Sequence, residues 1–195
     1  MSSKIGVMQT APQLFDIARK AAERHVKTNA AEDGLTAIVF AAVSLEALVN
    51  ELHELVSLEI AEDEVPHPKL SAFVQIVREI ENSHGLTRLK YLLASYVLRG
   101  RTYDKGAQPY QDYELLTKLR DALVHLKPTV LVEENGDTDV GIEGVFKQLQ
   151  KRGLVESLPA NVLSTLPALV STNSVVKWAM EVAASMAQSF ISMFP

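Results

Sequence analysis

The sequence predicts an all-α protein: an up-and-down helical bundle of about five core helices, with a small hairpin or irregular insertion before the last helix. Apolar residues recur at helical spacing over most of the chain, prolines and glycines separate these segments, and β-prone residues are confined to one short stretch. Its 195 residues, 47% of them apolar, are enough for one domain (1–195) with a sizeable core.

Two helices are expected in the first part of the chain. Apolar residues at helical spacing predict the first over 13–29, and we expect Asp33-Gly34 to end it. The second, over 35–61, is apolar on most of its circumference, which predicts the central helix. Pro66 and Pro68 place a connection after it.

Three more helices are expected over 70–82, 86–98 and 112–127. Residues 100–111 form the loop that precedes the third of these helices, and Pro128 stops it.

The pattern changes over 129–172, which we interpret as an insertion or arm before the last helix. Asn135-Gly136 is a hairpin-turn dipeptide beside a β-prone stretch, so 129–142 is expected to form a small hairpin or extended arm outside the bundle. A short helix follows over 143–151, and 158–172 is irregular or briefly helical.

The last helix is expected to be capped by Asn173-Ser174 and to end near Phe194. Lys177 and Glu181 interrupt its apolar residues, so the pattern indicates an amphipathic helix rather than a membrane span. This helix packs either on the bundle or on a second subunit.

Composition and charge narrow the functional classes. The chain has no cysteine, which excludes disulfides and thiolate metal sites, and its formal net charge of −5 disfavours non-specific attraction to nucleic acid. The one Glu-x-x-His spacing, from Glu81 to His84, falls at a helix end beside Gly85, which disfavours a metal site there. A His-Glu-x-x-His zinc motif, a phosphate-binding glycine loop and a nucleophile elbow are lacking, so we expect neither a metal nor a cofactor. The N-terminus lacks the apolar core of a signal peptide, and we expect a cytoplasmic protein with no membrane association.

The strongest chemical motif runs from Leu119 to His125 near the end of the helix over 112–127. Asp121 and His125 share a helix face, so the carboxylate can orient the imidazole. Arg120 carries a fixed planar cation suited to phosphate oxygens, and histidine suits proton transfer near neutral pH. Together these groups would support metal-independent phosphodiester cleavage. The alternative is structural, since cations stabilise a helix C-terminus and Arg120 and Asp121 can lie on a solvated face.

A polar row in the central helix supports the site interpretation. Glu46, Asn50 and His53 recur at four- and three-residue intervals within an apolar helix. If they are buried, they need partners, which Arg120 and His125 could supply. An ordinary solvent-exposed stripe is the other explanation.

These two segments resemble the HEPN superfamily (higher eukaryotes and prokaryotes nucleotide-binding domain). Arg120, Asp121 and His125 match the arginine, polar residue and histidine of its signature, and Glu46 resembles the acidic residue that many members carry on the preceding long helix. Lys127 stands where some toxin members have a tyrosine, which argues against that modified-toxin subgroup, although the lysine could contact phosphate.

The resemblance implies a metal-independent endoribonuclease of toxin or defence type that acts as a homodimer. The 2′-hydroxyl of RNA would attack the adjacent phosphate, with His125 as general acid or base, Arg120 stabilising the phosphorane and Asp121 orienting His125. An antitoxin or regulatory protein would be a further partner. Many HEPN proteins have lost activity, so a catalytically inactive dimeric interaction module is the alternative.

A basic and aromatic cluster precedes the motif helix. Its members could contact phosphates and stack on bases, or could simply be solvated. The RNA-binding candidates in this cluster are Arg99, Arg101, Tyr103 and Lys105, with Arg88 and Lys90 before them.

Overall fold

The computed structural model describes residues 10–62, 67–125, 142–156 and 166–194, which contain helices and no strand. The helices are α1 (Ala11–Thr28), α2 (Ala31–Glu62), α3 (Pro68–Asn82), α4 (Thr87–Arg99), α5 (Tyr110–Val124), α6 (Ile142–Lys151), α7 (Leu166–Val170) and α8 (Asn173–Ile191). The all-α helical fold that the sequence predicts is therefore confirmed.

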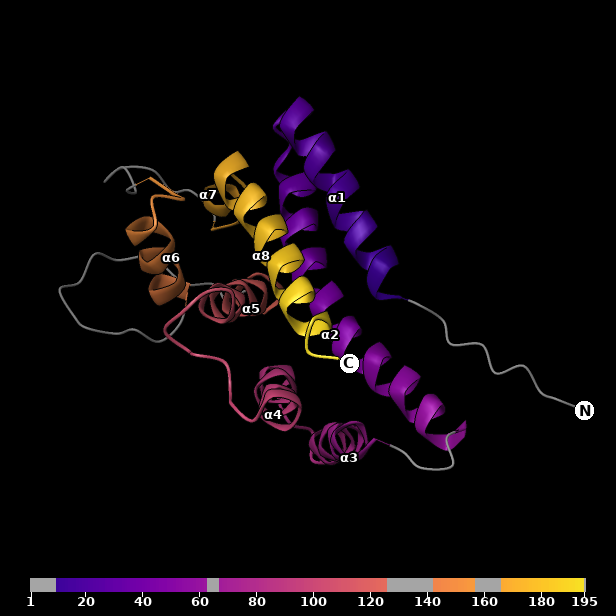
Figure 1. Ribbon diagram of the computed structural model, residues 1–195. Coiled ribbons are helices and arrows are strands. Elements are labelled where there is room, and N and C mark those ends of the chain that lie inside the picture. The colour runs from indigo at the N-terminus through magenta and orange to yellow at the C-terminus, as the bar shows by residue number, and fades with distance from the viewer. Residues whose placement is uncertain (1–9, 63–66, 126–141, 157–165, 195) are drawn as a thin grey trace, which may run out of the picture.

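The helices form two sets that cross one another. Helices α1, α2 and α8 run side by side, whereas α3, α4 and α5 are seen nearly end-on in the same view and lie across them (Figure 1). The central helix α2 has 32 residues and is therefore about 48 Å long. It contacts α1 and α8 as well as α3, α4 and α5, so it connects the two sets.

The turn between α1 and α2 differs from the expectation at Asp33-Gly34. The first helix instead ends at Asn29, whose φ of 54° is left-handed, and Asp33 and Gly34 belong to the first turns of α2. A Cβ at Gly34 would lie 2.9 Å from Ser171 Cβ and 3.1 Å from His25 Cε1. Gly34 is therefore needed for close packing against His25 and Ser171. The dipeptide Asp33-Gly34 alone does not distinguish this packing role from a role in a turn.

The insertion contributes to the core at α6. Val145, Phe146 and Leu149 are buried in the hydrophobic core, and Arg152, just beyond the helix, forms an ion pair with Asp112 of α5. The short helix expected over 143–151 corresponds to α6, whose apolar face covers α5. The hairpin expected over 129–142 lies outside the described residues except for Ile142, which begins α6.

The N-cap of the last helix lies one residue before the expected Asn173-Ser174. Thr172 is the N-cap residue, and its Oγ1 accepts a hydrogen bond from the backbone N–H of Val175 at 3.2 Å. The chain leaves the helix after Ile191, and Phe194 packs against the core just beyond its end.

Aromatic side chains fill the crossing of the two sets. The ring of Tyr91 packs edge-on against Tyr113 and Phe190, with centroids 4.9 and 4.7 Å apart. Its hydroxyl donates to the carbonyl of Leu45 at 2.6 Å. Tyr91 on α4 therefore contacts α2, α5 and α8 at one point.

The buried tyrosines give the fold a characteristic response to alkali. Burial raises the pKa of Tyr91, Tyr110 and Tyr113 above the ordinary tyrosine value. A folded-state pKa above the unfolded value contributes stability that is complete below about pH 10 and is lost as the pH rises further. We expect tyrosinate absorbance at 295 nm from these three side chains to appear together with the loss of helical circular dichroism.

The reference is the urea-unfolded chain, in which all five tyrosines should titrate near pH 10. Full ionisation of the five tyrosines near pH 10 in a chain that keeps its helical signal would contradict the burial described.

Candidate functional site

Arg120 forms the centre of a cluster that joins α5 to α2. Its side chain is 17% exposed, and an Nη2 hydrogen bond to Glu46 Oε1 makes an ion pair between the two helices. On the same helix, Nη1 lies 3.1 Å from Asp121 Oδ1. Two carboxylates from two helices therefore fix the guanidinium and compensate its charge.

The guanidinium retains one donor without a partner. Arg120 Nε is buried and makes no hydrogen bond within the described part of the chain. A buried unpaired donor is unfavourable by about 1–3 kcal/mol, so an oxygen acceptor placed there would be stabilising.

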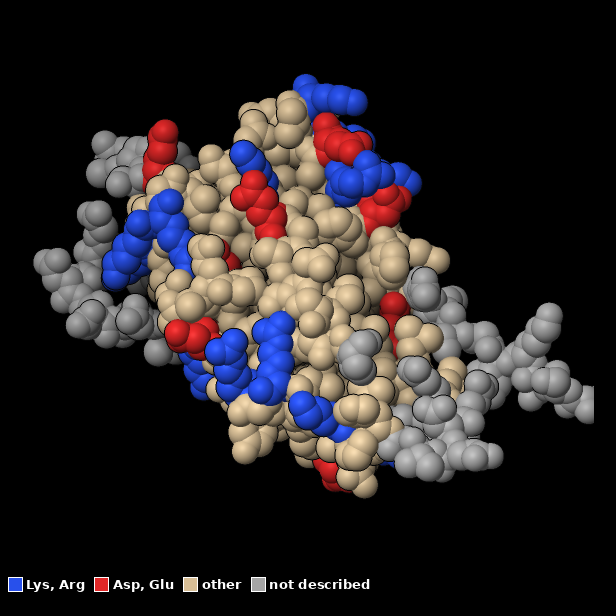
Figure 2. Space-filling view, in the orientation of Figure 1, with Lys and Arg blue, Asp and Glu red and all other residues tan. Residues whose placement is uncertain are grey.

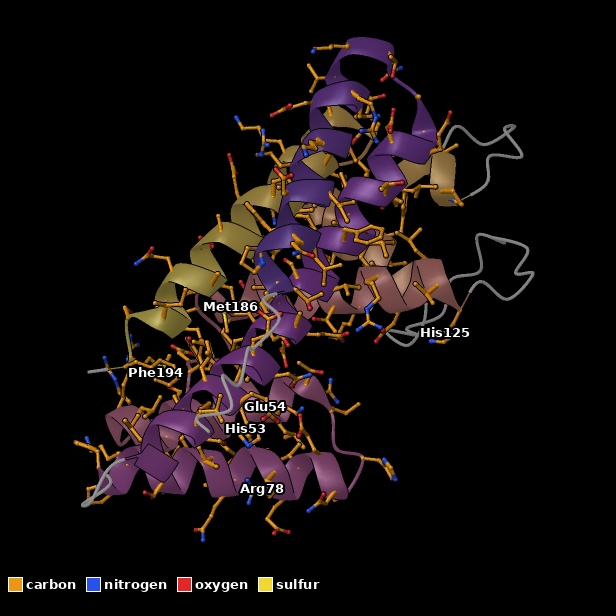
Figure 3. All side chains as sticks on the ribbon, turned by 90° about the vertical axis from the view of Figure 1, so that its right-hand side faces the viewer. His53, Glu54, Arg78, His125, Met186 and Phe194 are labelled. Carbon is orange, nitrogen blue, oxygen red and sulfur yellow. The ribbon has the colours of Figure 1, made fainter. Side chains whose placement is uncertain are left out.

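His125 lies at the point where α5 ends. It is the C-cap residue, with φ −108° and ψ 41°, and its backbone N–H donates to the Asp121 carbonyl at 2.9 Å. Its side chain is exposed and projects from the end of the helix, far from His53 and Glu54 (Figure 3). The imidazole is thus accessible to a ligand from solvent.

The carboxylate of Asp121 does not orient the imidazole as the sequence predicts. That prediction assumes helical geometry through His125, but the chain leaves the helix at this residue. Asp121 instead contacts Arg120, and within the described residues its side chain makes no hydrogen bond to His125. Lys127, the remaining candidate next to the motif, lies outside the described residues.

The three side chains of the polar row on α2 contact three different partners. Glu46 binds Arg120, whereas Asn50 Oδ1 accepts a hydrogen bond from Lys90 Nζ at 2.7 Å. His53 is 3% exposed and packs edge-on against Phe73, with ring centroids 6.4 Å apart. Only Glu46 therefore belongs to the motif cluster.

Lys90 is the residue whose role the sequence analysis missed. It is only 5% exposed, and its ammonium also pairs with Glu81 Oε1 at 2.6 Å, linking α4 to α3. The signal in the sequence is a lysine inside the apolar run Leu89–Leu93. Lys90 therefore does not belong to a surface basic cluster.

The candidate RNA-binding residues lie at the other end of α5 from the motif. They sit in or beside the loop before Tyr110, whereas His125 follows the last turn of α5, a helix about 22 Å long. Lys and Arg side chains form a row over the lower part of the face in Figure 2. Arg101 and Lys105 are exposed.

Arg99 and Tyr103 have structural partners. Arg99 donates to the Ser189 carbonyl at 3.3 Å and to Ser192 Oγ at 3.1 Å, near the C-terminus of α8. The ring of Tyr103 is buried and stacks on Tyr110 with centroids 5.3 Å apart. In this arrangement the Tyr103 ring is covered and cannot stack on a base.

Two further features bear on the functional class. Among the described residues, no three His, Asp or Glu side chains lie close enough together to hold a metal ion. Ala31–Leu58 has a length and composition that would suit a membrane span, but here it is the helix that contacts both sets of the bundle.

Comparisons with protein-family models, with curated proteins and with solved structures find no match to this chain. The HEPN resemblance therefore stays a prediction that rests on the motif residues and Glu46.

The ion pair between Glu46 and Arg120 should be measurable as a coupling energy. Because both side chains are partly shielded from water, we expect Glu46→Gln to lower the free energy of unfolding by about 1 kcal/mol. Asp121→Asn should have a smaller effect, since that carboxylate is 54% exposed. Urea unfolding of Glu46→Gln, Arg120→Gln and the double variant gives the coupling directly.

Glu79→Gln is the matched control, because this exposed glutamate on α3 makes no ion pair within the described residues. Equal effects of Glu46→Gln and Glu79→Gln, or a coupling near zero, would show that the pair does not hold α5 to α2.

Proposed function

We propose that this chain is a metal-independent endoribonuclease of HEPN type, with toxin-like or defence-like action on RNA. Arg120 and His125 are its catalytic residues, and Asp121 completes the motif. In this proposal the enzyme works in the cytoplasm as a homodimer, and an antitoxin or regulatory protein controls it.

The supporting observation is the arrangement at the end of α5. A guanidinium fixed by Glu46 and Asp121 lies within two helical turns of a solvent-exposed imidazole. A fixed cation beside a group that exchanges protons near neutral pH is what phosphodiester cleavage without a metal requires.

The chemistry assigns one task to each group. The RNA 2′-oxygen bonds to the adjacent phosphorus and gives its proton to a general base, while the bond from phosphorus to the 5′-oxygen breaks and that oxygen takes a proton from a general acid. The products are a 2′,3′-cyclic phosphate and a 5′-hydroxyl. His125 moves one of these protons, and Arg120 stabilises the charge on the phosphorane. Asp121, which contacts Arg120, acts as a positioning residue for the guanidinium.

Exposed basic residues before the N-terminus of α5 would also bind the substrate. Arg101 and Lys105 are exposed in the loop before α5 and can bind phosphates of the same RNA.

A second candidate function is a catalytically inactive dimeric interaction module. The observation that favours it is the pairing of Arg120 with two carboxylates, which leaves less charge for a phosphate. Cleavage assays separate the two functions.

The decisive experiment is cleavage of a mixed structured RNA in excess EDTA. We expect cleavage by the unaltered chain that leaves cyclic-phosphate ends, and a loss of about 100-fold or more in His125→Ala, because a general acid or base typically contributes that much. Arg120→Lys should also lose most activity, since lysine keeps the charge but not the planar fork.

Matched controls separate catalysis from folding. Arg78→Lys alters an exposed arginine on α3, and His84→Asn alters an exposed histidine whose φ of 53° asparagine tolerates. Both controls should keep full activity, and all four variants should still unfold cooperatively on heating. An inert unaltered chain, or His125→Ala that cleaves normally, would overturn the ribonuclease proposal.

A further inference from the structure

The outward face of α4 carries a row of exposed apolar side chains. We call this row the α4 stripe; its members, with their exposed fractions, are Leu86 (55%), Leu89 (41%), Leu93 (37%) and Tyr96 (58%). Leu89, Leu93 and Tyr96 recur at intervals of four and three residues, so they share one face of the helix, and Leu86 is the N-cap residue just before it. Four of the eight large apolar residues that are exposed in the described structure belong to the stripe.

Within the described ranges, no other helix covers the stripe. Helix α4 packs on α3 and α2, and these contacts leave the side chains of the stripe exposed. Scattered exposed apolar residues are normal, but a continuous row at this spacing is how a helix contacts another helix.

The charges beside the stripe indicate what kind of helix would fit. Arg88 and Arg99 are eleven residues apart, which is close to three turns, so both border the same edge of the stripe. Both are exposed, and neither pairs with a carboxylate within the described residues. Arg99 bonds only to the uncharged oxygens of Ser189 and Ser192.

The same charges disfavour a second copy of α4 as the occupant. Thr87–Arg99 contains three basic residues and no Asp or Glu. An antiparallel pair of α4 helices would place Arg88 and Arg99 of both copies along one edge, and like charges in that position repel. A parallel pair would offer no carboxylate to either edge.

A flat membrane surface fits less well than a helix. The stripe is only one helix wide, and the adjoining α3 exposes Glu79 and Asn82, which would have to lose water against lipid. A partner helix needs only the stripe and its basic edge.

We propose that the α4 stripe binds an amphipathic helix of another protein, with its apolar side packed on Leu89 and Leu93 and its Asp or Glu residues beside Arg88 and Arg99. The catalytic candidates do not lie on this face, so the proposal stands independently of the ribonuclease function.

The test uses two synthetic probes and the full chain. Both are fluorescein-labelled 21-residue helical peptides with leucine at the a and d positions of three heptads; one has glutamate and the other lysine at the e and g positions. Like charges along both edges keep each peptide from self-association. In fluorescence anisotropy we expect the glutamate peptide to bind about tenfold or more tightly than the lysine peptide.

Variants locate the binding on α4. Leu89→Ser combined with Leu93→Ser should weaken binding of the glutamate peptide about tenfold or more, whereas Ile17→Ser with Val26→Ser on α1 should leave it unchanged. Arg88→Glu should weaken the glutamate peptide and strengthen the lysine peptide, which a loss of folding would not do. All substituted side chains are exposed, and circular dichroism checks that the variants fold.

Three results would overturn the proposal. The first is equal binding of both peptides, or binding that the α4 variants leave unchanged. The second is self-association in sedimentation that Leu89→Ser with Leu93→Ser abolishes, which would identify a second copy as the occupant. The third is binding to phosphatidylserine vesicles, but not to peptide, that the same variant abolishes.

Discussion

The packing of Tyr91 is the constraint on which the rest of the structure depends. From α4 its hydroxyl reaches the Leu45 carbonyl on α2, and its ring contacts Tyr113 on α5 and Phe190 on α8. The next residue after Leu45 is Glu46, which pairs with Arg120. The contact that sets the crossing of the two helix sets therefore also sets the distance between the carboxylate and the guanidinium of the candidate site.

The carboxylates around Arg120 determine how the site could act. An anion that binds the guanidinium has to share it with Glu46, whose side chain is 31% exposed. Rearranging a pair at that exposure is less unfavourable than opening a buried one, because water screens the separated charges. The cluster is compatible with a site in which the arginine is held in place before the substrate arrives.

Local signals predicted the helices well, and long-range contacts explain what the sequence could not predict. Apolar periodicity located the long central helix and the motif helix, because one buried face produces that pattern. The crossing of α3 to α5 over α2 depends on side chains such as Tyr91 that meet residues more than 40 positions away. The partner of Asp121 was misassigned because α5 ends at His125, where spacing rules for helices no longer apply.

Two successive turns of α2 receive three side chains, two from neighbouring residues of α4 and one from α5. The hydroxyl of Tyr91 binds the Leu45 carbonyl, Arg120 binds Glu46, and Lys90 binds Asn50. A substitution in the Glu46–Arg120 pair or in the Asn50–Lys90 pair removes one hydrogen-bond partner from the side chain that remains. Diverged relatives of this chain should therefore show correlated changes at positions 46 and 120 and at positions 50 and 90. In a sequence alignment, these two pairs of positions would identify relatives better than the short arginine–histidine motif.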